Sequence, residues 1–117
     1  MEKFEDLVGK TLKDIVNIKG EELVFTLDNG EEYRLHHRQD CCESVTIEYI
    51  VGDLKDLIES PILMAEKVSN SINDNNNDEY YTWTFYKLAT VKGHVTIQWY
   101  GTINGYYSES VDWCKVN

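Results

Sequence analysis

The residues whose types could do chemistry are gathered in one short segment, residues 36–43. Its histidines, cysteines and carboxylates are the ligand types that zinc prefers in proteins, and the candidate residues are His36, His37, Asp40, Cys41, Cys42 and Glu43. The spacing does not match a zinc site, because no C-x2-C or H-x3-H pair occurs and Cys114 would have to come from across the fold. We predict a binding segment here with no metal or other cofactor, and keep a metal site as an alternative.

Two further interpretations of this segment stay open. A histidine, His36 or His37, could activate one of the two adjacent cysteines as a nucleophile, although the sequence offers no oxyanion device and no third group to orient the pair. The plainer interpretation is structural, because adjacent cysteines are commonly small buried apolar residues. Asp40 and Glu43 would then cap or bridge a turn.

Aromatic residues supply the second candidate surface, since ten of the chain's fourteen lie between Tyr80 and Trp113. In the strand expected over residues 94–100, alternation gives an apolar face made of Val95, Ile97 and Trp99. The opposite, hydroxyl-rich face is the predicted binding surface for a protein or a nucleotide base, with Tyr86, Tyr100, Tyr106 and Ser108 as candidates. The alternative is a second packed face, from a sheet buried on both sides or a homo-oligomer interface.

Motifs and charge favour binding over catalysis. The sequence contains no G-x-G-x-x-G, G-x-x-x-x-G-K-S/T, H-E-x-x-H or G-x-S-x-G. Its net charge of −10, from 21 acidic and 11 basic residues, argues against direct nucleic-acid binding, which needs a field of Lys and Arg. Fifteen of the acids lie in residues 1–60. An acidic surface there would suit a protein partner with a basic groove.

Cysteine usage and hydropathy indicate the compartment. Three cysteines, two of them adjacent, make a poor disulfide framework, so a reducing cytoplasm is expected. No apolar run follows the charged N-terminus, so we expect no signal peptide. No stretch of 18 apolar residues occurs, so no membrane association is expected either.

The elements that must position these residues are mainly antiparallel β-strands. The clearest hairpin has a three-residue loop, Asp28 to Gly30, whose Asn and Gly tolerate positive φ. This loop pairs Phe25 with Tyr33 and Leu23 with Leu35. All four side chains then share one face, which is expected to be buried.

We predict an α+β fold in a single domain, residues 1–117, that is mostly antiparallel sheet with one short helix. Strands are expected over 11–18, 45–51 and 62–68, and a polar loop over 69–78. The helix is expected over 54–59, with Asp53 as its N-cap. The last third is expected to form a three-stranded meander over 81–90, 94–100 and 106–116, in which Ile97 faces Val111 and Val95 faces Trp113.

Four strings in the chain carry a family resemblance: HHRQDCCESV at 36–45, GDLKDLIESPILMAEK at 52–67, YTWTFYKLATVKGHVTIQWYG at 81–101 and NGYYSESVDW at 104–113. Together they resemble a family of small uncharacterised proteins encoded by phages and prophages of bacteria. The most specific motifs are H-x-Q-D-C-C-E-x-V and W-T-F-Y-K-L-A-T followed by N-G-Y-Y-S-E-S-V-D. The similarity covers most of the chain from residue 36 onward, and no reaction is attached to it.

The resemblance implies a small accessory phage protein in the cytoplasm of a bacterial host. By analogy with such proteins, the leading hypothesis is a non-enzymatic anti-defence inhibitor. It would occlude a host protein or sequester a small nucleotide signal, with a homo-oligomer as one form. The alternatives are a metal- or cysteine-dependent enzyme centred on residues 36–43, or a structural protein of the phage particle.

Overall fold

The computed structural model describes residues 3–36, 43–74, 79–104 and 112–116, and within them the chain forms two antiparallel sheets. The small sheet has the strand order β1-β2-β3-β8, with β1 (Leu12–Ile18), β2 (Glu22–Leu27), β3 (Glu32–His36) and β8 (Asp112–Lys115). The long sheet has the order β4-β7-β6-β5, with β4 (Glu43–Val51), β5 (Met64–Asp74), β6 (Glu79–Thr90) and β7 (Gly93–Asn104). The mainly antiparallel β prediction is therefore confirmed.

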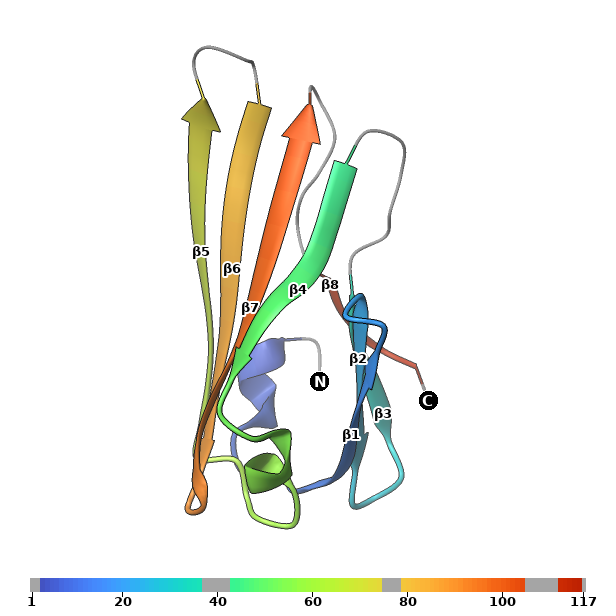
Figure 1. Cartoon of the computed structure of the whole chain (residues 1–117). Helices are drawn as coiled ribbons and strands as arrows, with labels where there is room; N and C mark the ends of the chain where they lie inside the picture. The colour runs from blue at the N-terminus through green and yellow to red at the C-terminus, as the bar shows by residue number, and fades with distance from the viewer. Residues whose placement is uncertain (1–2, 37–42, 75–78, 105–111, 117) are drawn as a thin grey trace.

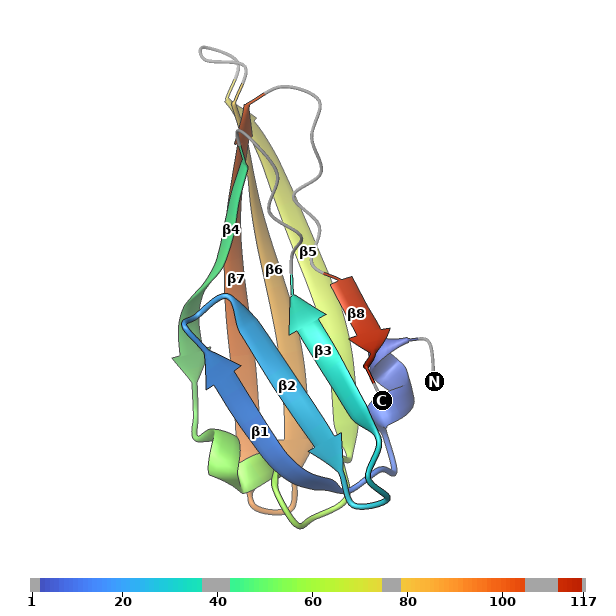
Figure 2. The ribbon, with the colours of Figure 1, turned by 90° about the vertical axis from the view of Figure 1, so that its right-hand side faces the viewer.

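The two sheets face each other, and the small sheet covers only part of the long one (Figures 1 and 2). Alternation along each strand sends one set of side chains into the space between the sheets. The largest fully buried side chains are Trp99, Tyr33, Tyr86, Phe25, Leu7, Leu12, Leu23, Leu27, Leu35, Leu57, Ile62 and Leu88. No helix in the described residues is long and apolar enough to cross a membrane.

The predicted hairpin is confirmed with its register. β2 pairs with β3 so that Leu23 lies opposite Leu35 and Phe25 opposite Tyr33, and all four are buried. The Leu27 N–H donates to the Glu31 carbonyl at 2.8 Å across the loop. Gly30 has a φ of +92°, the left-handed conformation that a Cβ would disfavour.

The predicted helix over residues 54–59 is wrong in length and type, because the structure has a single 3-10 turn, η2 (Leu54–Leu57). Its predicted cap is confirmed, since the Asp53 carboxylate accepts the Lys55 N–H at 2.9 Å. The turn ends early because the residues that follow it, Ile58 and Glu59, pair with Leu12 of β1 instead. The Glu59 N–H donates to the Leu12 carbonyl at 2.8 Å.

The predicted C-terminal meander is wrong in its third strand. β6 and β7 do pair, but the other neighbour of β7 is β4, and β8 pairs with β3 in the small sheet. Trp113 therefore lies opposite Leu35 and not opposite Val95. The Trp113 ring stacks on Tyr33 with centroids 5.1 Å apart, and such aromatic contact favours this partner choice. Val111 lies outside the described residues.

The polar loop predicted from residue 69 is also wrong at its start, because β5 continues to Asp74 in register with β6. β5 is the last strand in its sheet. An edge strand forms backbone hydrogen bonds with one neighbour only, and its side chains need not be regularly apolar. The asparagine-rich sequence can therefore form a strand without the apolar alternation that predicts one.

Candidate functional site

The first predicted site, residues 36–43, is only partly described. His36 ends β3 in register with Glu22 of β2 and Asp112 of β8, and it is half-buried. Its Nδ1 atom is buried and has no hydrogen-bond partner among the described residues. His37, Asp40, Cys41 and Cys42 lie outside the described residues, as does the Glu43 side chain. In the remaining chain, no three His, Cys, Asp or Glu side chains are placed to hold a metal ion.

The described candidate surface is the face of the long sheet turned away from the small sheet (Figure 1). The burial pattern identifies this face, because Val95, Ile97 and Trp99 of β7 are buried against the small sheet, as the alternation predicts. Residues between them are exposed or half-buried on the opposite side. We call this surface the aromatic face and define it by Tyr49, Val51, Val68, Trp83, Phe85 and Tyr100.

Three aromatic side chains form the centre of the aromatic face. Trp83 lies directly opposite Tyr100 across β6 and β7, and their ring centroids are 4.7 Å apart. Trp83 also stacks with Phe85, two residues along the same strand, at 6.2 Å and an interplanar angle of 14°. All three rings are half-buried. They are therefore held against each other while part of each residue stays accessible, which lowers the entropy lost on binding.

The flanks of the aromatic face are more exposed than its centre. On β4, Tyr49 is 60% exposed and Val51 55% exposed, and on β5, Val68 is 43% exposed beside Phe85. The charged residues in register on this side include one of each sign, Glu66 and Lys87, directly opposite each other. The residues that define the surface are thus apolar and aromatic, in a strongly acidic chain. These are properties of protein-binding surfaces, in which aromatic residues are enriched and charges depleted.

The prediction that Tyr86 belongs to an exposed surface is wrong. Tyr86 is 1% exposed and points between the sheets, where its ring meets Phe4 edge-on at 4.7 Å. It has the same phase on β6 as buried Leu88, and it lies opposite Ile97, a core residue of β7. Tyr100 does lie on the outer side, as predicted, although half-buried. Tyr106 and Ser108 lie outside the described residues.

Sequence reasoning overlooked most of the aromatic face: Trp83, Phe85, Tyr49, Val51 and Val68. A signal was available, because β6 and β7 are joined by the two-residue turn Val91-Lys92, with Thr90 opposite Gly93. Counting back from this turn places Trp83 opposite Tyr100. The clean alternation of β7 then assigns both rings to the outer face.

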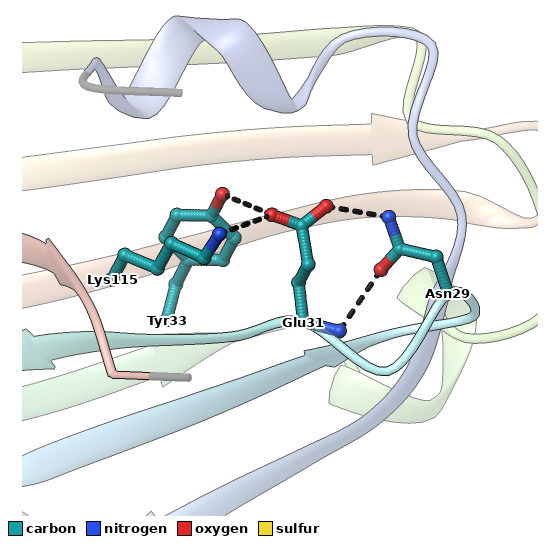
Figure 3. Close-up of polar contacts among 4 residues, drawn as sticks. All are labelled: Asn29, Glu31, Tyr33 and Lys115. Carbon is teal, nitrogen blue, oxygen red and sulfur yellow. Dashed lines mark hydrogen bonds and ion pairs between the residues drawn. The ribbon is translucent and has the colours of Figure 1, made fainter.

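A polar cluster at the β2–β3 loop was not anticipated either, and it consists of Asn29, Glu31, Tyr33 and Lys115 (Figure 3). The Glu31 Oε2 atom accepts the Tyr33 hydroxyl at 3.0 Å and lies 3.1 Å from Lys115 Nζ. The Asn29 side chain donates to the other carboxylate oxygen at 2.5 Å and accepts the Glu31 N–H at 2.9 Å. Lys115 comes from β8, so the cluster joins the C-terminal strand to the β2–β3 loop.

The cluster shifts the titration of its members. Hydrogen bonds from Lys115, Asn29 and Tyr33 lower the pKa of Glu31 to about 2 from an ordinary value of 4.5. Burial and the hydrogen bond to Glu31 raise the pKa of Tyr33. The hydrogen bond to Glu31 also raises the pKa of Lys115. A carboxylate with a pKa this low is a weak proton acceptor at neutral pH, so the cluster is unsuited to general-base chemistry.

Residues 5–113 match a family model described as a domain of unknown function (DUF7448), and the chain therefore belongs to this family. No curated protein and no solved structure matches the chain.

Proposed function

We propose that the chain acts by non-enzymatic binding of a protein partner and that the aromatic face is the contact surface. The observation that carries this proposal is the row of mutually packed rings, Trp83, Phe85 and Tyr100, on a sheet face that no other described element covers. Buried aromatic residues contribute most of the binding energy in many protein interfaces. Exposed apolar side chains at Tyr49, Val51 and Val68 extend the same surface.

The form of the surface favours a protein over a nucleotide. Small ligands are held in concave sites that bury most of their surface, with a few polar groups fixing their orientation. A sheet face with outward-pointing rings offers one contact side and suits a broad, complementary partner. Sequestration of a nucleotide signal therefore ranks second.

The biological setting of this proposal is that implied by the phage-protein resemblance. The partner would be a protein of a bacterial host, and its occlusion would inhibit a defence function. The apolar aromatic face would provide the contact energy. The acidic remainder of the chain would favour approach to a basic partner.

A matched pair of photo-crosslinking positions tests the proposal in bacterial cells. A photoreactive amino acid replaces either Val51 on the aromatic face or Val16 on the outer side of the small sheet, where 45% of the side chain is exposed. We expect a discrete crosslink to one host protein from position 51 and none from position 16. Crosslinks from position 16 alone would place the contact on the small sheet and contradict the proposal.

A further inference from the structure

One polar side chain, that of Gln98, lies in the middle of the aromatic face. Gln98 of β7 is directly opposite Tyr49 of β4 on one side and Phe85 of β6 on the other. Directly opposed residues on one face of an antiparallel sheet have Cβ atoms about 4.5–5.5 Å apart. Tyr100 follows Gln98 two residues along β7 and has the same phase. The Gln98 side chain therefore has aromatic neighbours on three sides.

The amide of Gln98 is available for hydrogen bonding. Gln98 is half-buried, and within residues 3–36, 43–74, 79–104 and 112–116 no group forms a hydrogen bond with its side chain. A primary amide offers one carbonyl oxygen as an acceptor and two N–H donors. A partner that covers the aromatic face would exclude water from this amide.

The position of this amide restricts what the aromatic face can bind. A buried polar group that is left unpaired weakens binding, because its lost contacts with water are not replaced. A purely apolar partner surface would leave the amide in that state. A charged partner group would also be disfavoured, because Tyr49, Phe85 and Tyr100 offer it no opposite charge. The complementary group is therefore uncharged and supplies both a donor and an acceptor.

We propose that Gln98 determines the specificity of the aromatic face by pairing with an exposed backbone amide in a loop or edge strand of the partner protein. Each backbone residue supplies an N–H donor and a C=O acceptor close together. Inside an α-helix these groups are already bonded to one another, whereas a loop or an edge strand leaves some of them free. The inference rests on the proposed function and names the chemistry that the partner presents to the same surface.

Crosslinking in bacterial cells from position 51 tests the role of Gln98, with the crosslinked host protein as the probe. Gln98→Met removes the amide and nearly keeps the length of the side chain. We expect the yield of the position-51 crosslink to fall about fivefold or more, because the partner's backbone amide is left unpaired. A Gln98 that is merely solvated would give the opposite result, since methionine enlarges the apolar surface. An unchanged or increased yield would therefore overturn the proposal.

Thr46→Val is the matched control, because Thr46 is a half-buried polar residue directly opposite Tyr100 on the same face. It should leave the yield unchanged, and a loss equal to that of Gln98→Met would overturn the specific role of Gln98. Thermal unfolding followed by circular dichroism checks that both variants are folded. The absence of any position-51 crosslink when Gln98 and Thr46 are both present would contradict the proposed function itself, and this inference with it.

The location of the contact on the partner gives a second readout. Mass spectrometry of the crosslinked peptide identifies the partner segment that lies beside position 51. We expect a loop or an edge strand, and a segment inside a helix would overturn the proposal. Alanine substitution of any Asn or Gln in that segment should leave the yield unchanged. A loss of yield there would assign the pairing amide to a partner side chain and overturn the backbone assignment.

Discussion

The chain uses aromatic side chains in two regions that lie on opposite sides of one sheet. Between the sheets, the rings of Phe4, Phe25, Tyr33, Tyr86 and Trp113 pack edge-on or stacked at centroid distances of 4.7 to 5.4 Å. On the aromatic face, Trp83, Phe85 and Tyr100 make similar contacts with each other but remain half-buried. The inner rings join η1 (Phe4–Leu7), β8 and the hairpin to the long sheet. The outer rings lie on β6 and β7, on the face of the long sheet turned away from the small sheet.

Residue type does not separate the core from the aromatic face in this molecule, whereas the phase of a residue along its strand does. Tyr86 and Phe85 are neighbours in sequence, yet one is fully buried and the other is on the outer side. Burial of the inner rings stabilises the fold. The outer rings are only half-buried, so they are expected to contribute less to stability, and the proposed function assigns their accessible parts to a partner.

One matched pair of substitutions should affect the stability of the two regions very differently. Tyr86→Ala empties a fully buried site and should lower the free energy of unfolding by about 3–5 kcal/mol. Tyr100→Ala removes a half-buried ring from a cross-strand pair and should cost about 1 kcal/mol. Urea denaturation followed by fluorescence measures both values. Equal losses would show that the aromatic face is a second core.

Lowering the pH should have a smaller effect on stability, and this effect should arise at Glu31, which contacts the inner ring of Tyr33. The pKa of Glu31 is lowered to about 2 in the folded chain from an ordinary value of 4.5. Its contribution to stability is therefore complete above about pH 4.5 and is lost as the pH falls through about 2. The stability advantage of the natural sequence over Glu31→Gln should shrink across this window. Because Glu31 holds Tyr33 and Lys115, the loss should loosen β8 first.

Unfolding free energies measured at several pH values check this expectation. Glu32→Gln is the control, because Glu32 is the adjacent acid and has no part in the cluster of Figure 3. It should retain the acid dependence of the natural sequence. An advantage over Glu31→Gln that is constant from pH 7 to the acid limit would contradict the assigned role of Glu31.

Local signals predicted the parts of the fold that depend on neighbours in sequence. The hairpin register followed from Asp28 to Gly30 and the alternation on either side, and the β7 faces followed from strict alternation. The third meander strand could not be predicted, because β8 pairs with β3 and not with β7. The stacking of Trp113 on Tyr33 favours this pairing, and the two residues are far apart in the sequence. The strand predicted over 62–68 ended too early, because β5 continues to Asp74. Its last residues lack apolar alternation, which an edge strand does not need.

The candidate site was predicted only in part, for a related reason. β6 carries aromatic residues in both phases, so its sequence alone does not say which of Phe85 and Tyr86 faces inward. Only pairing with β7 assigns them. Tyr100 was placed correctly because β7 has one clear apolar phase. The segment at 36–43 stays a prediction, since most of it lies outside the described residues.

Binding of a protein partner by the aromatic face can be measured as the affinity of the crosslinked partner for two charge-introducing variants. Tyr49→Asp changes a side chain that is 60% exposed on the aromatic face, and Val16→Asp changes one that is 45% exposed on the small sheet. Both substitutions avoid the core, so calorimetry compares folded proteins. We predict that Tyr49→Asp weakens binding at least about tenfold, or about 1.4 kcal/mol, and that Val16→Asp leaves the Kd unchanged. The reverse order, or equal affinities for both variants, would contradict the account.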